Sequence, residues 1–519
     1  MKVALIVPGS KAAVTNPRYR ALFPHLLPMS AAYLGAVLER GGHDVVLIDQ
    51  AVRCMSNQEL VATLVREKID VAGISLLTTT VSNVLDLVSI LRKELPGVPV
   101  VMGNHHASLF AQDLLANGIA DLVVRGEGEA TLLETVDALE RSGKHGKANL
   151  GAEALGKANL GAAVLGESNL GAAVLGKIEG LSFRCDGEVI HNPQRPVIAD
   201  LDSLPYPAWH LVELFHPRYM ELPIIGVYST PLSVMASRGC PFHCVFCSQD
   251  TQYKKVRLRD TLKVVDEIEE LVDRHRFEWF SFNDAYFPWT RKQGFEFADE
   301  LIRRGLHKRV RWITESRVDM VDDELMRRLR ESGLSVIFFG FESGNQRVLD
   351  LAGKRTTLAQ AKKAAQAARK AGVLIMGFFM LGLPGDTVES CWDTVDFAID
   401  LDCDFAKFAV TVPYPGSALF DQQKGRIDAS QFEKFTSWYD WASGDEALLY
   451  APEGMTVQEL LSIQRAGMLK FYARPSQVWR HLSRGTIRPG PMLTGATVLL
   501  EGALKDVVRK VRRAVGSRG

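Results

Sequence analysis

Short, continuous apolar runs alternate with longer amphipathic stretches along the first 140 residues. The runs read KVALIVPG, DVVLIDQ, DVAGISLLT, VPVVMGN and ADLVVRGEG, and helix-like segments such as MSAAYLGAVLERGG separate them. Continuous apolar strands that alternate with amphipathic helices are typical of a parallel sheet covered on both faces. The pattern therefore predicts a doubly wound, Rossmann-like α/β domain over residues 1–140.

A second alternation begins at residue 232. Its six strand-like runs are LSVMASRG, WFSFND, VRWITES, SVIFFGFES, LIMGFFMLGLPG and DFAKFAVTVPYPG. Six βα units predict an open, partial (β/α)6 barrel over residues 232–430, with its chemistry at the C-terminal ends of the strands. After that the pattern turns helical and irregular, so we expect a mainly helical C-terminal region over residues 431–519.

Two unlike segments join the predicted domains. Residues 141–178 contain a ten-residue repeat in three copies, with leucine recurring every five residues from Leu150 to Leu175. That period matches neither helix nor strand, and the segment is too short for a solenoid, so a surface insertion is favoured over a functional element. Residues 179–231 read as a connector, with a small hairpin in GLSFRCDGEVIHNP followed by a proline-containing extended stretch.

Composition and charge narrow the class of protein. Hydrophobic residues make up 47% and charged residues 24%, and 61 basic residues balance 61 acidic ones. Overall neutrality gives no electrostatic reason to expect nucleic-acid binding. No apolar run approaches the roughly 20 residues that span a bilayer, and the N-terminal run is too short for the core of a signal peptide. We therefore expect a cytoplasmic, reducing location, where clustered cysteines bind metal or act in catalysis.

Such a cluster follows the first barrel strand, in the segment CPFHCVFC. Cys240, Cys244 and Cys247 have the spacing C-x3-C-x2-C, and the other four cysteines are scattered. A structural zinc site needs four ligands; His243 lies inside the segment, but no second ligand pair follows. A structural 4Fe-4S cluster needs four cysteines, so three thiolates predict a cluster with one open iron. Three unrelated buried cysteines would not explain this spacing.

The segment CPFHCVFC resembles the cluster loop of radical S-adenosylmethionine (SAM) enzymes. The resemblance implies that the three cysteines hold a 4Fe-4S cluster whose open iron binds SAM, and that an electron from a flavodoxin-like or ferredoxin-like partner cleaves SAM to a 5′-deoxyadenosyl radical. Phe246 stands where this family packs a ring near the adenine.

The resemblance continues along the barrel. FNDAYF, WITESRVD, FGFESGNQRVL, MGFFMLGLPGDT and VPYPGSALF are similar to the family's segments after the second to sixth strands. The SAM contacts that it implies are Asn283 and Asp284 for the amino group, Arg317 for the carboxylate, Glu342 and Ser343 for other polar atoms, and Gly377, Gly382 and Pro413 beside the adenine.

The N-terminal domain resembles the cobalamin-binding subfamily. MGNHHASLF and VRGEGEATLLE are similar to that subfamily's segments at the strand ends, although Asn104 and His105 depart from its usual glycine and proline. Carboxyl ends of parallel strands bind ligands, so the expected cobalamin contacts are Thr78, Gly103, His106, Gly126 and Glu127. A D-x-H-x-x-G motif is absent, so we predict no histidine ligand to cobalt. An ordinary hydrogen-bonded loop is the structural alternative for His105 and His106. A G-x-G-x-x-G motif is also missing after the first strand, which disfavours a dinucleotide.

Cobalamin beside a radical generator implies methylation of an unactivated carbon in a small biosynthetic intermediate. Within the family, one SAM methylates cobalamin and a second provides the radical. Two alternatives stay open: radical cyclisation or rearrangement without methyl transfer, as in the oxidative cyclase of bacteriochlorophyll synthesis, and a non-catalytic cobalamin or iron–sulfur sensor. A methylthiotransferase is disfavoured, because it would need a second three-cysteine cluster and only Cys54 lies in the N-terminal domain.

The sequence does not identify the substrate. Trp438, Tyr439 and Trp441 could line an apolar pocket, although aromatic residues of this kind more often belong to a core. The basic segment GALKDVVRKVRRAVGSRG at the C-terminus could touch a membrane, but a solvated helix is favoured.

Overall fold

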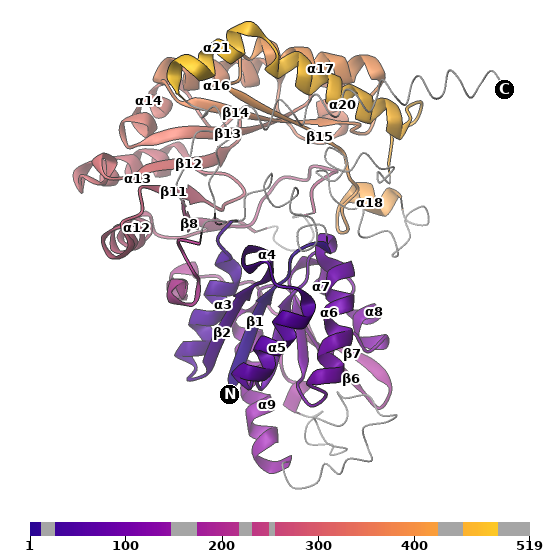
Figure 1. The fold of residues 1–519 in the computed structure, drawn as a ribbon. Coiled ribbons are helices and arrows are strands. Elements are labelled where there is room, and N and C mark those ends of the chain that lie inside the picture. Colours follow the sequence, from indigo (N-terminus) through magenta and orange to yellow (C-terminus); the bar gives the residue numbers. More distant parts are fainter. Residues whose placement is uncertain are drawn as a thin grey trace, which may run out of the picture. The chain divides into compact units, whose positions relative to one another are not determined.

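The computed structural model describes residues 1–11, 26–146, 174–216, 219, 231–248, 255–423 and 450–485. They form two compact units, Met1–Tyr219 and Met220–Gly519, which we treat separately (Figure 1). Most of the predicted repeat, the aromatic residues 438–441 and the basic C-terminal segment lie outside the described residues.

The first unit contains a seven-stranded sheet in the order β2-β1-β3-β4-β5-β6-β7. Five parallel strands confirm the predicted doubly wound architecture: β1 (Lys2–Val7), β2 (Asp44–Asp49), β3 (Val71–Ser75), β4 (Val100–Gly103) and β5 (Leu122–Val124). The hairpin of β6 (Leu181–Cys185) and β7 (Glu188–His191) extends this sheet as antiparallel strands. The sequence predicted the hairpin but not that it joins the sheet.

Helix α5 of the first unit begins and ends at capping residues. Ser56 and Glu59 form a capping box at the start of α5, and Lys68 ends the helix in the left-handed conformation. The helices and 3-10 turns are α3 (Met29–Arg40), α4 (Gln50–Arg53), α5 (Asn57–Glu67), η1 (Thr78–Thr80), α6 (Val81–Glu94), α7 (His105–Leu109), α8 (Ala111–Ala116), α9 (Gly128–Gly146), η3 (Leu201–Ser203) and η4 (Trp209–Leu211).

The second unit is built on a six-stranded parallel sheet in the order β15-β14-β13-β12-β11-β8. Its strands are β8 (Leu232–Val234), β11 (Trp279–Phe282), β12 (Arg311–Ser316), β13 (Leu334–Glu342), β14 (Leu374–Leu381) and β15 (Phe405–Val410). Each strand pairs with its neighbour in sequence, which confirms the predicted partial (β/α)6 barrel. A separate two-stranded ribbon pairs β9 (Ser237–Arg238) with β10 (Arg257–Leu258).

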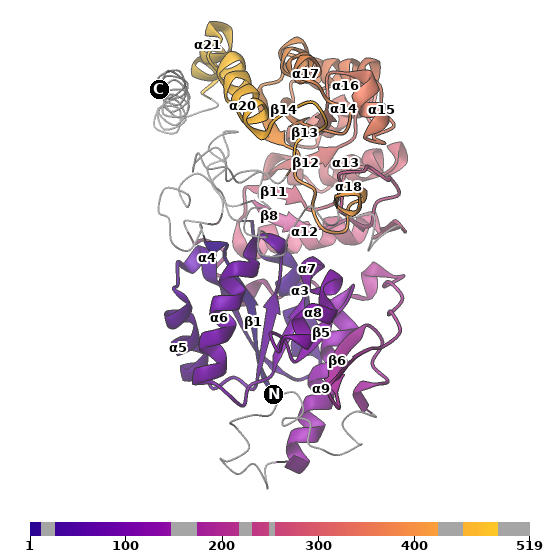
Figure 2. The ribbon, with the colours of Figure 1, turned by 90° about the vertical axis from the view of Figure 1, so that its right-hand side faces the viewer.

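Amphipathic helices cover one face of this sheet, and α14 packs beside both α13 and α16 (Figure 2). Thr357 and Gln360 cap the start of α16, and Gly372 ends it with a φ of 74°. The helices and one 3-10 turn of the unit are α12 (Thr261–His275), α13 (Arg291–Arg303), η7 (Leu306–Lys308), α14 (Asp323–Glu331), α15 (Gln346–Leu351), α16 (Leu358–Ala371), α17 (Val388–Asp400), α18 (Ala418–Gln422), α20 (Val457–Tyr472) and α21 (Pro475–Arg484).

Aromatic side chains hold the first strands of the barrel against α13. Phe297 of this helix packs edge to face on Phe282 of β11 and Trp312 of β12, with ring centroids 5.3 and 5.4 Å apart. Phe287, just beyond β11, stacks on Phe282 at 4.0 Å. Edge-to-face pairs add to the energy of burial, so this cluster fixes the carboxyl end of β11, where two predicted site residues lie.

Gly377 in β14 has a packing reason for lacking a side chain. A Cβ atom there would lie 2.5 Å from the Phe379 ring and 3.1 Å from the Cys403 sulfur. Both of these neighbours are completely buried. Gly377 was predicted to lie beside the adenine of SAM, and the packing of the strand itself also favours glycine at this position.

We predict that Gly377→Ala lowers the free energy of unfolding by about 1–3 kcal/mol, because the buried Phe379 ring must move to admit the methyl group. Gly97→Ala is the matched control, since a Cβ there meets no atom within 4 Å. Urea unfolding of both variants checks this; equal stability of the two would contradict the packing argument.

Candidate functional site

The three motif cysteines lie in one loop after the first barrel strand. The loop begins at Gly239, whose φ of 98° turns the chain away from β9. Cys240, Cys244 and Cys247 are partly exposed and form no disulfide bond. The Cys247 amide donates to the Cys244 carbonyl at 3.0 Å, so the last two cysteines share a tight turn.

Two neighbouring segments of the barrel clamp this cysteine loop. The Val245 amide donates to the Ala352 carbonyl at 3.0 Å, and the Val245 carbonyl accepts from the Leu419 amide at 2.9 Å. Phe246 packs against Val348, Ala352 and Leu383. The ring predicted to lie near adenine therefore anchors the loop to the segment after β13; its contact with SAM stays a prediction.

The buried carboxyl group of Asp284 holds the chain just before the cysteine loop. Its oxygens accept hydrogen bonds from the Ala236 amide at 2.9 Å and from the Ser237 hydroxyl, which in turn accepts from the Trp289 indole at 2.5 Å. Burial raises the pKa of Asp284 to about 7. Asp284 thus positions β9 and the loop, whereas its exposed neighbour Asn283 has its side chain available to a ligand.

Arg317 stands against the cysteine loop, after β12. Its guanidinium lies 3.5 Å from the centroid of the Phe242 ring, a cation–π contact. It donates two hydrogen bonds of 3.0 Å to the carboxylate of Asp319 and one of 3.3 Å to the Lys354 carbonyl. The residue predicted to bind the SAM carboxylate is therefore preorganised by Asp319 beside the loop.

Glu342 and Lys354 form a buried ion pair next to Cys244. The Lys354 amine lies 2.7 Å from the Glu342 carboxylate, and Glu342 itself has a φ of 64°. Burial alone would lower the pKa of Lys354, but the charges of Glu342 and Cys244 raise it overall, so the amine stays protonated. Glu342 was among the predicted residues and Lys354 was not; the place of Lys354 in LAGKRT, just after the helix that clamps the loop, was the available signal.

The remaining predicted SAM contacts lie at the carboxyl ends of β13, β14 and β15. The buried Ser343 hydroxyl shares a hydrogen bond of 3.2 Å with Thr394 and accepts from the Asn345 amide. Gly382 has a φ of 84°, and its amide donates to Asp386 at 2.9 Å. Pro413 is buried just beyond β15. These residues share one edge of the sheet, as the parallel topology requires.

Two ionisable side chains that the sequence analysis missed occupy the sheet face opposite the helices. Glu315 of β12 pairs in register with Phe338, and Lys407 of β15 pairs with Phe378. Protein surroundings raise the pKa of Glu315 to about 7, with the nearby Glu342 charge adding to the effect, although its side chain still reaches water. Burial lowers the pKa of Lys407 to about 7, against the opposing effect of Glu315. Both groups can exchange protons near neutrality.

The donor set of the cysteine loop fits an iron–sulfur cluster. Within the described ranges, no three His, Cys, Asp or Glu side chains converge on a single ion. A cubane cluster does not require that convergence, because each cysteine binds a different iron. Thiolates are the ligands that such clusters prefer. Burial raises the pKa of Cys244 to about 11, so this thiol must release its proton when it binds iron.

The predicted cobalamin contacts of the first unit lie at the carboxyl edge of its sheet. Thr78 and His106 are buried and joined by a hydrogen bond of 3.0 Å between Oγ1 and Nδ1. The His106 ring stacks on Phe110, with centroids 4.4 Å apart, and burial lowers its pKa to about 3, so the ring is neutral. The hydrogen bond and the stacking contact hold this neutral ring in one orientation.

Glycines shape the same edge. Gly126 has a φ of 78° and donates its amide to Ser108 at 3.2 Å, and a Cβ on Gly103 would meet nothing closer than 3.7 Å. Glu127 accepts from the Ile198 amide at 2.6 Å, which gives it a structural contact. An edge with a buried neutral histidine and little side-chain bulk fits a large cofactor that lies along the strand ends.

A buried amide network, which the sequence analysis missed, completes this edge. Gln50 accepts hydrogen bonds from the Gly9 amide at 3.2 Å and from Asn83 at 2.8 Å, and donates to Asn57 at 2.7 Å. It joins the carboxyl ends of β1 and β2 to α6. The order β2-β1-β3 reverses the direction of winding at β1, the point where doubly wound domains bind ligands.

Known protein families match both units of the chain. Residues 24–136 match the model of the B12 binding domain, and residues 234–398 match that of the Radical SAM superfamily. The anaerobic magnesium-protoporphyrin IX monomethyl ester cyclase of Rubrivivax gelatinosus is 30% identical over 79% of this chain and 68% of its own length. The chain belongs to the cobalamin-binding radical SAM family.

Other relatives of this family match over greater lengths. An uncharacterized methyltransferase of Pyrococcus horikoshii is 28% identical, over 92% of this chain and 93% of its own. The solved structure of the radical SAM methyltransferase TsrM from Kitasatospora setae, with cobalamin and a [4Fe-4S] cluster bound, has the same fold, with a TM-score of 0.61 at 17% identity over 89% of this chain and 81% of that one. Family membership makes this chain a radical SAM enzyme with a 4Fe-4S cluster, SAM and cobalamin as cofactors.

In the part of the chain that the structure describes, no helix combines the length and the apolar character needed to cross a bilayer.

The raised pKa of Asp284 predicts a pH-dependent stability. The folded carboxyl keeps its proton up to about pH 7, whereas an unfolded one releases it near 3.8. Stability from this group is therefore lost as the pH rises between those values. Relative to wild type, Asp284→Asn should gain stability from pH 4 to 7 and then level off. Denaturant unfolding across this range checks it, with Asp299→Asn as an exposed control; a constant difference would be contrary evidence.

The ion pair beside Cys244 generates a second prediction. Lys354→Met should lower the free energy of unfolding by about 3–5 kcal/mol, because it leaves the Glu342 carboxylate buried without its partner. Lys354→Met/Glu342→Gln should be more stable than the single variant, since the unpaired charge is gone. Urea unfolding of both variants and of Glu342→Gln completes the cycle; simple additivity would refute the coupling.

Proposed function

We propose that this enzyme, in the cytoplasm, transfers a methyl group from SAM by way of cobalamin to an unactivated carbon of a small biosynthetic intermediate. The observation that carries the proposal is the nearly complete mutual coverage with the Pyrococcus horikoshii methyltransferase. The cyclase of Rubrivivax gelatinosus, in contrast, has about a third of its length outside the match. The two-unit chain thus corresponds in extent to the methyltransferase.

Radical cyclisation or rearrangement without methyl transfer is the second candidate. The higher sequence identity of the cyclase, 30% against 28%, favours it. Both reactions use the same radical, so the cysteine loop and the strand ends do not distinguish them. The difference lies in whether cobalamin carries a methyl group to the product.

The residues of the barrel support defined roles in either reaction. The three cysteines would hold the cluster; Arg317, against the loop, would bind the SAM carboxylate, and the exposed Asn283 would bind its amino group. When bound, the cluster supplies the electron that cleaves SAM, and cobalamin supplies a methyl carrier. Glu315 and Lys407, both able to exchange protons near neutrality, lie on the inner sheet face, where a substrate would meet them.

An external reductant is part of the proposal. The cluster needs one electron for each SAM that is cleaved, and flavodoxins and ferredoxins are proteins of suitable chemistry. We expect a small-molecule substrate, because the site is formed by strand ends and the chain carries equal numbers of basic and acidic residues.

The deciding experiment uses anaerobically reconstituted enzyme with cobalamin, SAM and a strong reductant. Mass spectrometry would follow 5′-deoxyadenosine and S-adenosylhomocysteine together. A methyltransferase should form both products, the second only when cobalamin is present. 5′-Deoxyadenosine alone, with the family's biosynthetic substrates supplied, would favour cyclisation, and neither product from cluster-loaded protein would favour a non-catalytic sensor.

The cysteine assignment predicts complete loss of SAM cleavage in each of Cys240→Ala, Cys244→Ala and Cys247→Ala, since three ligands leave no spare. Cys185→Ala, in β6 of the first unit, is the control and should cleave SAM at the wild-type rate. Release of 5′-deoxyadenosine measures the effect, and iron content and the visible spectrum show whether the cluster is lost. A motif variant with wild-type activity would disprove the assignment.

A further inference from the structure

A cavity opens at the amino ends of the barrel strands, the end opposite the cysteine loop. Its volume is about 480 Å³, which lies in the range of small-molecule sites. Trp279, Arg311 and Leu374 are the first residues of β11, β12 and β14, and Ser335 is the second residue of β13. The cysteine loop instead follows the carboxyl end of β8, so parallel strands separate this cavity from the SAM edge.

Arginine dominates the wall of this cavity. Five arginines and two aspartates line it, which leaves three formal positive charges: Arg311, Arg330, Arg369, Arg480 and Arg484, with Asp402 and Asp404. The chain as a whole has no formal net charge, so the cavity holds a local excess of positive charge. Field lines focus in such a recess, so it attracts anions.

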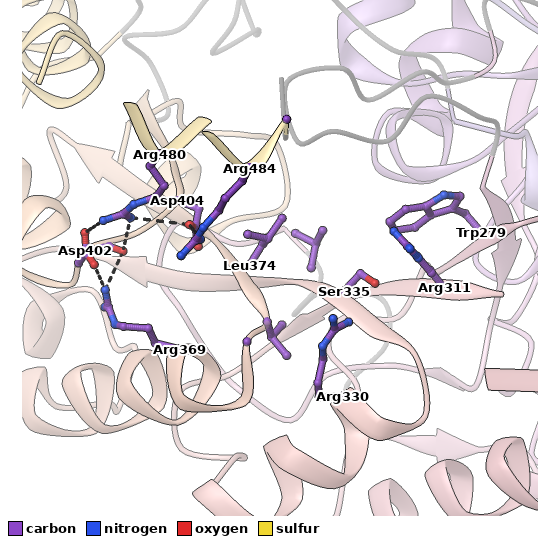
Figure 3. Close-up of a pocket in the computed structure, with 14 residues that line it drawn as sticks. Trp279, Arg311, Arg330, Ser335, Arg369, Leu374, Asp402, Asp404, Arg480 and Arg484 are labelled. Carbon is purple, nitrogen blue, oxygen red and sulfur yellow. Dashed lines mark hydrogen bonds and ion pairs between the residues drawn. The ribbon is translucent and has the colours of Figure 1, made fainter. Parts of the chain in front are cut away.

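The two aspartates engage only the arginines on one side, as Figure 3 shows. Asp402 pairs with Arg369 and Arg480, and Asp404 lies 3.2 Å from Arg484. The second oxygen of Asp404 accepts from the Ile375 amide at 2.9 Å. These contacts tie α21 to the starts of β14 and β15 and build a rigid acidic and basic side wall.

Within the described residues, two arginines on the other side of the cavity have no carboxylate partner. Arg330 donates one hydrogen bond of 3.0 Å to the Leu334 carbonyl, and the Arg311 guanidinium lies 5.8 Å from the centroid of the Trp279 ring. Across the residues that the structure describes, neither forms an ion pair with a carboxylate. Both side chains are exposed, so the N–H groups of their guanidinium groups remain available to an anion.

The floor of the cavity is apolar. Val336 belongs to the buried layer with Ile313 and Phe405, and Leu374 and Trp279 pack against that layer. An apolar floor with an aromatic ring suits a planar group, whereas arginine forks suit phosphate oxygens. A ligand that uses both must combine a ring with at least two negative charges.

We propose that this cavity binds a nucleoside diphosphate or a molecule of the same class, with its ring against Trp279 and its phosphates between Arg311 and Arg330. The site is independent of the proposed methyl transfer. It gives the enzyme a second binding site for an anionic metabolite, at the end of the barrel away from the radical chemistry.

Titration calorimetry with ADP tests the proposal on cofactor-loaded enzyme. Saturating SAM is present throughout, so that the adenosine group cannot enter the SAM site. We expect ADP to bind with a micromolar Kd, and adenosine or pyrophosphate alone to bind about tenfold or more weakly, because each uses only one part of the cavity. Added salt should weaken ADP binding.

Arg311→Gln/Arg330→Gln should raise the Kd for ADP about tenfold or more, and Arg311→Lys/Arg330→Lys should give an intermediate value. Arg66→Gln, an exposed arginine in the first unit, is the matched control and should leave binding unchanged. Melting temperatures verify that the variants fold. No ADP binding at millimolar concentration, or equal binding by wild type and the double glutamine variant, would overturn the proposal.

Discussion

The hydrogen bonds of the buried Asp284 carboxyl group hold the chain that leads into the cysteine loop. They join the end of β11 to Ala236 and Ser237, the residues that lead from β8 into the loop. The aromatic cluster around Phe282 and Phe297 fixes β11. The packing of the barrel core therefore determines where the cysteine loop lies. A cluster with an open iron needs a loop of fixed geometry, because SAM must meet both the iron and the strand ends. The burial that strengthens these bonds also makes the carboxyl group costly to ionise, so the residue that positions the loop lowers the stability of the fold once it loses its proton.

Strand periodicity explains why the fold was predictable. Continuous apolar runs such as KVALIV and LIMGFFML can only be buried in a sheet covered by helices, and their order gave both parallel sheets. The hairpin after the first domain was predicted as a hairpin, but a pairing partner cannot be read from a local pattern. Phe183 faces Leu122 across the antiparallel pair β5–β6, a contact between distant residues that only the tertiary structure reveals.

Residues of the candidate site that belong to a motif of fixed spacing could be predicted from the sequence. Residues whose charge or pKa depends on their buried surroundings could not. The cysteines, Glu342 and Arg317 followed from segments at strand ends. Lys354 has no motif of its own; it matters because the chain brings its amine to Glu342 and Cys244. Glu315 and Lys407 were missed for a similar reason, since alternating polar residues in a strand normally face solvent. In an incomplete barrel the same alternation directs them to the inner face, where their pKa values shift toward neutrality.

Parallel strands give the second unit two chemically different ends. At the carboxyl ends, the loop conformations, the positive φ of Glu342 and a buried ion pair assemble a site for a charged cofactor. At the amino ends, Arg311 and Arg330 occur beside an apolar layer that closes the barrel interior. The amino ends of barrel strands usually serve stability, and the pairs of Asp402 and Asp404 with arginines fit that role. Arg311 and Arg330 contribute no ion pair to it within the described chain, and stability alone does not explain two exposed guanidinium groups around one apolar floor. A ligand with negatively charged groups explains these two positive charges better.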